Sequence, residues 1–222
     1  MRLVLADDNY LVREGVRRLL DDGPEVETVG TAASAPELLA VVARLRPDVV
    51  LTDIRMPPGF GTDGITAARQ IRAEHPEIGV LVLSQHADAS YANALFDGGT
   101  AGLGYLLKDR VADRDDIVRG LRAVHEGGSV VDPAVVDALL AAQRRERDSP
   151  VHRLTARELD VLREMAAGRT NGAIAARLHV SESAVSKHVA AIFAALGLHE
   201  SRAVDRRVSA VLAWLEHRAP EA

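Results

Sequence analysis

The run Val49-Val50-Leu51-Thr52-Asp53 is a short apolar stretch that ends in a carboxylate. Because residues 49–52 carry apolar or β-branched side chains at every position, they predict a strand buried on both faces, as in a parallel sheet covered by helices. Similar runs occur before and after it in the chain. We predict strands at residues 3–6, 26–31, 49–52, 79–83 and 104–107, with the more polar run at 26–31 at an edge of the sheet.

Longer stretches with apolar residues at helical spacing separate these runs. In the first stretch, Val12, Val16, Leu19 and Leu20 fall on one face of a helix. The predicted helices cover residues 10–20, 36–44, 65–74, 88–96 and 115–126. Five alternating strand–helix units indicate an α/β fold, a doubly wound five-stranded parallel sheet with helices on both faces.

The pattern changes after residue 130. Gly127-Gly128 ends the last of these helices. A further helical stretch is predicted from Asp132-Pro133 to about Arg147, followed by a polar run that closes at Pro150. We therefore predict a domain over residues 1–130, a helical linker over 131–150, and an all-α four-helix domain over 151–222.

The four helices of the last part have recognisable ends. Thr155 and Glu158 form a capping box at the start of the first helix, which ends at Gly168. A short helix over 171–178 is followed by a turn and by a helix from Ser181 to about residue 196. The last helix is predicted to begin at Ser201 or Arg202 and to run to residue 218, with an apolar stripe that includes Val208, Val211, Leu212 and Leu215.

The net charge of −5 hides a difference between the two halves. Residues 1–150 contain 17 Lys or Arg and 24 Asp or Glu, whereas residues 151–222 contain 10 and 8. An acidic part joined to a mildly basic part fits a regulatory module linked to a nucleic-acid-binding module. The chain has no cysteine, which excludes disulfides and thiolate metal sites. It has no unbroken apolar run of about 18 residues and no secretory signal, so we expect a cytoplasmic protein without a membrane partner.

Polar side chains of complementary chemistry follow four of the predicted strands. Asp7-Asp8 follow the first strand, Asp53 the third, Ser84 the fourth and Lys108 the fifth. In doubly wound sheets, ligands bind at the carboxyl ends of the strands. Carboxylates that lie close together need a cation, and carboxylate oxygens with water are typical of Mg²⁺ sites. Asp53 can then act as a nucleophile that forms an acyl phosphate, with Lys108 offsetting the charge of the phosphoryl group.

Each of these residues taken alone also fits an ordinary structural role. Asp7, Asp8 and Asn9 are good residues for the start of the first helix, and Asp53 lies before Pro57 in a segment that resembles a turn. A lone serine or lysine carries little information. The hypothesis of a phosphoryl site therefore rests on the joint placement at four strand ends.

The same residues resemble the motifs of response-regulator receiver domains. The resemblance rests on Asp7-Asp8, Asp53, Ser84 and Gly104-Tyr105-Leu106-Leu107-Lys108. It implies a flavodoxin-like fold in which Asp53 is the phosphoacceptor. It also implies a Mg²⁺ site formed by Asp7 through water and by Asp8, Asp53 and the backbone carbonyl of Arg55. In that family an aromatic residue at the position of Tyr105 turns inward as the residue at Ser84 moves toward the phosphate.

The segment after Asp53 departs from this family pattern. It reads Arg55-Met56-Pro57-Pro58-Gly59-Phe60-Gly61-Thr62-Asp63-Gly64. If Gly64 takes the place of the second glycine of the usual motif, the loop is three residues longer than in most relatives. We expect this loop to overhang the phosphorylation site and to affect kinase docking or the lifetime of the acyl phosphate.

The C-terminal part resembles the LuxR-type helix-turn-helix. The resemblance rests on Leu154-Thr155 with Glu158, Asn171 with Ile174-Ala175, Val180-Ser181, and Val185 with His188-Val189. Together the two parts resemble NarL/FixJ-type two-component response regulators over nearly the whole chain. Helix 171–178 is then expected to cross the DNA backbone and helix 181–196 to enter the major groove. The implied DNA-binding residues are Arg169, Thr170, Asn171, Arg177, Ser181, Ser183, Ser186, Lys187 and Ala190.

The resemblance implies a regulator that is not an enzyme. Its partners would be a sensor histidine kinase, promoter DNA and a second copy of the chain, bound when Asp53 is phosphorylated. One alternative is a phospho-dependent interaction protein that does not bind DNA, because Ser186, Ala190 and Ala194 leave the recognition helix poor in charge. Another is an aspartate-nucleophile phosphatase. Those enzymes place a second acid two residues after the nucleophile, where this chain has Arg55.

Overall fold

The computed structural model describes residues 1–199 and 205–218, and only the backbone of residues 146, 148, 216 and 218. The start of the last helix, predicted at Ser201 or Arg202, therefore lies outside the described residues. The chain divides into two compact units, Met1–Leu140 and Ala141–Ala222, each described below by itself. None of the helices in the described ranges combines the length and the apolar character that a membrane crossing requires.

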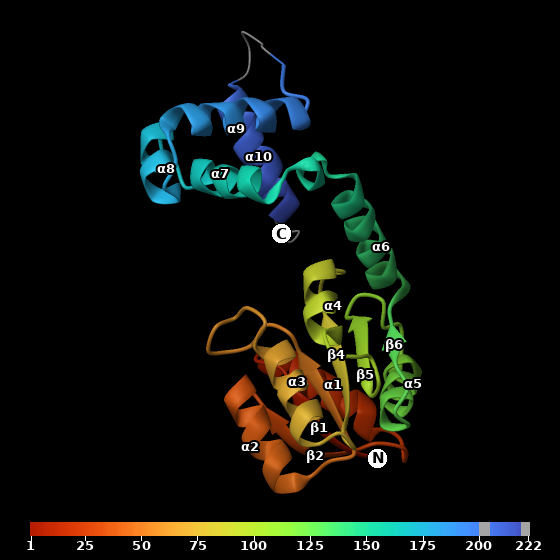
Figure 1. The fold of residues 1–222 in the computed structure, drawn as a ribbon. Helices are drawn as coiled ribbons and strands as arrows, with labels where there is room; N and C mark the ends of the chain where they lie inside the picture. The colour runs from red at the N-terminus through yellow and green to blue at the C-terminus, as the bar shows by residue number, and fades with distance from the viewer. Residues whose placement is uncertain (200–204, 219–222) are drawn as a thin grey trace. The chain divides into compact units, whose positions relative to one another are not determined.

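The first unit is built on one parallel sheet (Figure 1). Its strands are β1 (Arg2–Ala6), β2 (Glu27–Ala32), β3 (Val49–Asp53), β4 (Gly79–Ser84), β5 (Leu103–Leu107) and β6 (Val130–Val131). They follow the order β2-β1-β3-β4-β5-β6, with the polar β2 at one edge, as predicted. The first five lie within one residue of their predicted bounds.

The sixth strand corrects the prediction of five. The chain turns at Gly127, which has a φ of +80°, and returns beside β5, where Val130 pairs with Gly104 and Val131 with Tyr105. Two residues are too few to show an alternating pattern, and the pairing depends on the distant β5. The sequence therefore placed Val131 in a helical linker, whereas the structure places it in the sheet.

Helices cover both faces of this sheet (Figure 1). One face packs against α2 (Ala35–Leu45), α3 (Asp63–Glu74) and α4 (Ala89–Phe96), and the other against α1 (Tyr10–Asp21) and α5 (Arg114–His125). All five lie within two residues of their predicted bounds. The two apolar cores fix the strand ends in space, and with them the polar residues that follow the strands.

The helix α6 (Pro133–Asp148) begins inside the core of the first unit. Val135 is fully buried, with 0% of its surface exposed, and packs in the same core as Tyr105. Asp132 precedes the helix and accepts a hydrogen bond from the Ala134 N–H at 2.9 Å. The first turn of the predicted linker is therefore part of the sheet-containing unit.

The second unit is all-helical. After a short 3₁₀ helix (η1, Pro150–Arg153) come α7 (Ala156–Ala166), α8 (Asn171–Leu178), α9 (Glu182–Ala195) and α10 (Arg206–Arg218). The predicted capping box is present: Thr155 and Glu158 bond each other's backbone N–H groups at the start of α7. Val161, Leu162, Ile174, Val185 and Ile192 are fully or nearly fully buried in one core with Trp214. This core holds α8 and α9 as a helix-turn-helix.

Candidate functional site

Four strand ends converge on one cavity of about 360 Å³ in the first unit. Asp7 follows β1, Asp53 and Ser84 end β3 and β4, and Lys108 follows β5. The structure therefore brings together the residues that the sequence predicted from their positions after separate strands. The residues that line the cavity also include Asp8, Asn9, Arg55, Phe60, Gln85, His86 and Tyr91.

The ammonium group of Lys108 lies between two carboxylates. Lys108 Nζ is 2.8 Å from Asp7 Oδ2 and 2.7 Å from Asp53 Oδ1. Asp7 is 4% exposed, and the Asp53 side chain is also largely withdrawn from solvent. The second oxygen of Asp53, Oδ2, accepts a hydrogen bond from the Arg55 N–H at 3.1 Å. These contacts fix the orientation of the Asp53 carboxylate at the base of the cavity.

Burial and the neighbouring charges shift the pKa values of Asp53 and Lys108 in opposite directions. Burial raises the pKa of the Asp53 carboxyl above its ordinary value, and the nearby Lys108 only partly offsets this effect. For Lys108, burial lowers the pKa, but the hydrogen bonds to Asp53 and Asp7 outweigh burial and raise it. Lys108 therefore carries its positive charge at neutral pH and can neutralise negative charge in the cavity.

Asn9, rather than either aspartate, caps the first helix. Its side-chain oxygen accepts from the N–H groups of Leu11 at 3.0 Å and Val12 at 3.3 Å. Asp7 Oδ1 in turn accepts from the Asn9 N–H at 2.9 Å. Asp8 is exposed at the cavity. Of the three residues that the sequence offered as caps, Asn9 takes this role, and the Asp8 carboxylate faces solvent.

The polar groups on β4 and β5 meet at His86. The Ser84 hydroxyl donates to the His86 carbonyl at 3.0 Å and accepts from the His86 N–H at 3.1 Å. The Tyr105 hydroxyl donates to the same carbonyl at 2.8 Å, and the Tyr105 side chain is fully buried. In this arrangement Tyr105 is turned inward, and Ser84 is bonded to its own turn rather than to Asp53.

The carboxylates at the cavity suit a hard cation. Among the residues that the structure describes, no group of three or more acidic, histidine or cysteine side chains is arranged as a metal site, and Lys108 lies between Asp7 and Asp53. The groups that the sequence assigned to a cation, the carboxylates of Asp7, Asp8 and Asp53 and the Arg55 carbonyl, are nevertheless all oxygen donors, and all four residues line the cavity. Oxygen donors with room for water are the ligands that Mg²⁺ prefers.

The long loop after β3 has a defined structure. Gly64 lies against the backbone of Asp53: its N–H bonds the Ile54 carbonyl at 2.9 Å, and a Cβ at this position would lie 1.9 Å from the Asp53 carbonyl oxygen. This close approach leaves no room for a side chain at position 64. The Asp63 carboxylate accepts from the N–H groups of Gly59 at 3.3 Å and Gly61 at 3.1 Å. Sequence reasoning did not single out Asp63 or Phe60.

The helix-turn-helix presents the predicted surface. Thr170 and Ser181 cap α8 and α9, where they accept from the N–H groups of Ala173 and Ala184. On α9, the side chains expected to face DNA are exposed: Ser183, Ser186, Lys187 and Ala190. The Asn171 side-chain N–H₂ lies 3.4 Å from Ser186 Oγ and links the two helices.

Two of the arginines expected at phosphates are held by one glutamate. Glu164 on α7 bonds Arg169 at 2.5 Å and Arg177 at 2.9 Å, and only 15% of its side chain is exposed. A further arginine, Arg207 on α10, donates to Asn171 Oδ1 at 3.0 Å and to the Arg169 carbonyl at 2.6 Å. The sequence did not indicate Glu164 or Arg207, because these contacts join helices that are distant along the chain.

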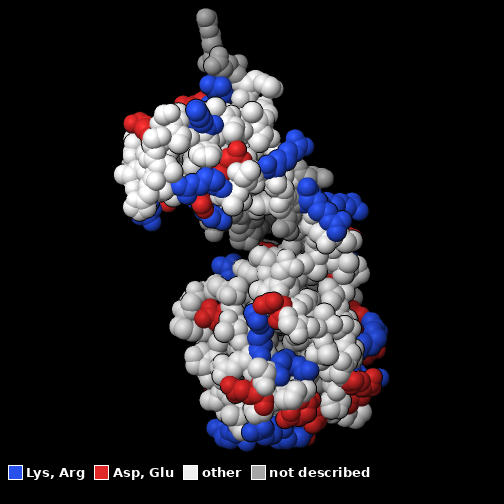
Figure 2. All heavy atoms as spheres, in the orientation of Figure 1, with Lys and Arg blue, Asp and Glu red and all other residues white. Residues whose placement is uncertain are grey.

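On the side that Figure 2 shows, the Lys and Arg side chains of the second unit form separate patches between uncharged surface rather than one continuous basic face. The helix α9 contains one acidic residue, Glu182, one lysine, Lys187, and one histidine, His188. The recognition helix therefore offers few charged groups for a polyanion, and most of its exposed side chains are neutral.

Comparisons with known proteins match both units. Residues 3–121 match the family described as response regulator receiver domain, and residues 152–207 match the bacterial regulatory proteins of the luxR family. The chain is 34% identical over 217 residues to the transcriptional regulatory protein DegU of Brevibacillus brevis, covering 90% of this chain and 89% of that one. The chain belongs to the response regulators that carry a LuxR-type DNA-binding domain.

Other relatives span the whole response regulator. The probable transcriptional regulatory protein NarL of Mycobacterium tuberculosis is 37% identical over 204 residues, and the alignment covers 91% of each chain. The RcsB response regulator of Salmonella typhimurium shares the fold with a TM-score of 0.66 and 25% identity, covering 97% of this chain and 99% of that one. RcsB has also been solved as a DNA complex, which matches this regulator with a TM-score of 0.59 and 25% identity over 99% of each chain.

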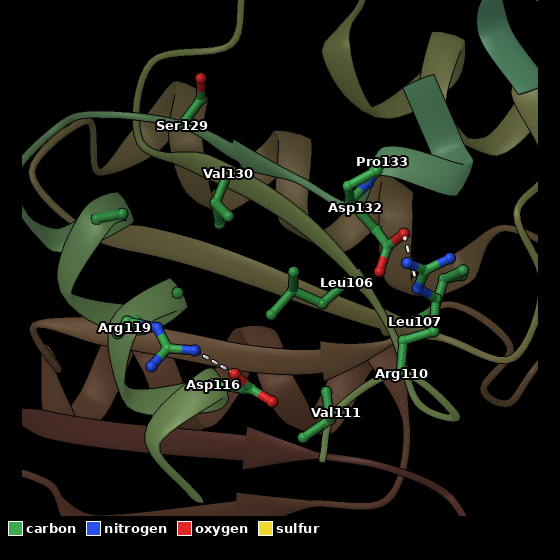
Figure 3. A pocket seen from close by; sticks show the side chains of 12 residues that line it. Leu106, Leu107, Arg110, Val111, Asp116, Arg119, Ser129, Val130, Asp132 and Pro133 are labelled. Carbon is green, nitrogen blue, oxygen red and sulfur yellow. Dashed lines mark hydrogen bonds and ion pairs between the residues drawn. The ribbon is translucent and has the colours of Figure 1, made fainter. Parts of the chain in front are cut away.

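The response regulator has a second cavity, of about 500 Å³, beside β5 and α5 (Figure 3). At its rim the side chains of Arg110 and Asp132 point toward one another, with Arg110 Nε 3.4 Å from Asp132 Oδ1. The Asp132 N–H also donates to the Tyr105 carbonyl at 2.8 Å. Both the segment after Lys108 and the strand of Tyr105 are thus bonded directly to Asp132, the residue before α6.

Proposed function

We propose that a partner histidine kinase phosphorylates the regulator on Asp53, and that this modification controls dimerisation and the binding of promoter DNA. The observation that carries the proposal is the fixed Asp53 carboxylate with Lys108 2.7 Å away, in a cavity open to a phosphoryl donor. The receiver and LuxR-type family matches support it.

The transfer itself needs few groups. An Asp53 oxygen attacks the phosphorus of a phosphohistidine, the P–O bond forms, and the P–N bond breaks. The imidazole leaves with the electron pair and takes up a proton from solvent. Lys108 offsets the negative charge that the cavity gains, and the Arg55 N–H holds the carboxylate in position.

The carboxylates of Asp7, Asp8 and Asp53 and the carbonyl of Arg55 would hold Mg²⁺, with Asp7 acting through water. When bound, the cation neutralises part of the charge on the phosphoryl oxygens. Asp7 also keeps Lys108 in place through the 2.8 Å ion pair.

The new phosphoryl oxygens give Ser84 and Lys108 new partners. The Ser84 hydroxyl can exchange its bonds with His86 for a bond to phosphate, which changes the carbonyl environment of the Tyr105 hydroxyl. We place the resulting shift in β5, which carries Tyr105, and in α4 and α5, which cover the two faces of the sheet at this strand. A shift in β5 would reach α6 through Asp132.

DNA binding would use α9 in the major groove. Ser186 and Lys187 can donate to base edges, Ala190 can contact a thymine methyl, and the capped starts of α8 and α9 face phosphates. Ser183 and Arg177 would add backbone contacts. On α10, Val208, Leu212 and Leu215 are about half exposed on one stripe, which supports a homodimer that reads two half-sites. Such a regulator acts where the chromosome is, in the cytoplasm.

The test is capture of fragmented genomic DNA by the purified full-length chain, with and without Mg²⁺ and beryllofluoride as a phosphoryl mimic. We expect specific fragments to be enriched with the mimic, and no such gain for Asp53→Ala. Specific enrichment that is equal in both conditions would contradict phospho-control.

A second candidate is a phospho-dependent interaction protein that does not bind DNA. It is favoured by the contacts of Glu164 with Arg169 and Arg177, which occupy two cations that would otherwise meet phosphates. The same capture experiment decides between the two functions. A mimic-dependent change in oligomeric state without enrichment of any fragment would support the interaction protein.

A further inference from the structure

We propose that Phe60 forms an apolar lip over Asp53 that restricts attack by water on the acyl phosphate and so lengthens its lifetime. The proposal rests on phosphorylation at Asp53. Phe60 lines the same cavity as Asp53, Ser84 and Lys108. With 52% of its surface exposed, it is the large apolar side chain of the cavity lining that extends most into solvent.

The position of Phe60 is imposed by the loop. Its backbone has a φ of +53°, a left-handed conformation that costs a residue with a Cβ on the order of 1 kcal/mol. Two hydrogen bonds hold it there: the Phe60 N–H donates to the Met56 carbonyl at 3.1 Å, and Arg55 Nε donates to the Phe60 carbonyl at 3.2 Å. Met56 is fully buried, so the first of these bonds anchors the loop to the core.

The residues on both sides of Phe60 are held as well. Asp63 accepts from the N–H groups of Gly59 and Gly61 with the two oxygens of one carboxylate. Asp63 is itself the first residue of α3. The loop tip is thus fastened to the core on one side and to a helix on the other, which keeps the ring at the cavity.

The Phe60 ring acts on hydrolysis of the acyl phosphate at Asp53, the step that returns the regulator to its unphosphorylated form. In hydrolysis, a water oxygen attacks phosphorus, the bond from phosphorus to the Asp53 oxygen breaks, and the carboxylate leaves with the electron pair while the water loses a proton. The attacking water has to enter the cavity and be oriented by polar groups. Phe60 offers it no hydrogen bond and adds a half-exposed apolar ring to the lining, whereas Asp8, Gln85 and His86 in the same lining are polar and exposed.

The experiment measures the loss of phosphate from the full-length protein. The protein is labelled with phosphoramidate and Mg²⁺, the donor is removed by desalting, and phosphorylated protein is followed over time on a phosphate-affinity gel. The main variant is Phe60→Asn, because asparagine accepts a left-handed backbone and removes the ring without forcing the loop to move. Tyr10→Ala is the matched control, since Tyr10 is an exposed aromatic residue that does not line the cavity.

We expect Phe60→Asn to lose phosphate about threefold faster than wild type or more, because water reaches the site more easily. Phe60→Trp should restore the wild-type rate or slow it further, and Tyr10→Ala should match wild type. Equal rates of phosphate loss for wild type, Phe60→Asn and Phe60→Trp, with normal labelling of each, would contradict the role of Phe60. Phosphorylation at Asp53 would not be affected by that outcome. Failure of the wild type to label, under conditions where a known receiver labels, would instead overturn the proposed function.

Discussion

At the residue scale, the cavity at the strand ends holds one cation, Lys108, between the carboxylates of Asp7 and Asp53. Removing Lys108 leaves Asp7 and Asp53 unpaired, and Asp53 already has a raised pKa through burial. In metal-free buffer we expect Lys108→Ala to lower the free energy of unfolding of the first unit by about 2 kcal/mol. Urea unfolding with EDTA measures this. Lys187→Ala, which removes the exposed lysine of the other unit, should leave that transition unchanged.

The pH dependence of this loss follows from the raised pKa of Lys108. A lysine whose pKa is raised in the folded state stabilises the fold below its unfolded pKa of about 10.4. That stabilisation is lost as the pH rises through the folded pKa. The difference between wild type and Lys108→Ala should therefore be present at pH 8 and decrease at strongly alkaline pH. A difference that grew with pH would contradict the assignment.

Gly64 is a second residue whose identity the site requires. A Cβ at Gly64 would meet the Asp53 carbonyl oxygen at 1.9 Å, which only a backbone shift can relieve. We expect Gly64→Ala to destabilise the first unit by about 2 kcal/mol or more, and to slow labelling of Asp53 by phosphoramidate. Gly61→Ala is the matched control in the same loop, because a Cβ at Gly61 would meet nothing within 4 Å. Equal labelling rates in the two variants would show that Asp53 tolerates the shift.

The residues of the cavity and of the helix-turn-helix unit differ in how far the sequence alone could predict them. Asp53 and Lys108 were predicted because each follows a strand, and strands of a parallel sheet end at one edge. Phe60 was not, because its place at the cavity depends on the left-handed backbone of a longer loop. Glu164 was not, because its contacts with Arg169 and Arg177 join separate helices.

At the scale of elements, α6 is tied through Asp132 to β5 and to Arg110, which follow and flank the proposed phosphorylation site. Asp132 is nearly buried, caps the first turn of α6, and contacts Arg110 (Figure 3). We expect Asp132→Ala to cost about 1 kcal/mol of stability and to lower hydrogen-exchange protection in the first turns of α6. Asp137→Ala, on the exposed side of the same helix, should change neither. Unchanged protection in Asp132→Ala would mean that Val135 alone holds the helix.

The elements that the sequence missed are those without a local signal. The amphipathic stretch of α1 and the buried runs of β3 and β4 could be read within a window of a few residues. The strand β6 has two residues and exists because Gly104 and Tyr105 on β5 offer a partner edge. A pairing of that kind is set by tertiary structure, so the local sequence predicted a linker instead.

At the scale of the whole molecule, a chain with a net charge of −5 has to bind a polyanion. Its affinity must therefore come from local arrangement rather than from overall charge. Glu164 is central here, because it neutralises Arg169 and Arg177 beside the helix that would cross the DNA backbone. The second unit thus has fewer cations available for phosphates than its sequence suggests, which favours DNA binding by two copies together.

We expect Glu164→Gln to make the positive charges of Arg169 and Arg177 available to DNA. With Glu164 neutral, Arg169 and Arg177 can pair with phosphates, so we expect tighter binding to a duplex and a salt dependence that is steeper by about one to two released counterions. Fluorescence anisotropy of a labelled duplex across a salt series measures both. Asp160→Asn makes the same change of charge on the same helix, away from these two arginines. If the two variants shift the slope equally, net charge alone controls the affinity; a larger shift for Glu164→Gln places the effect in the two arginines it holds.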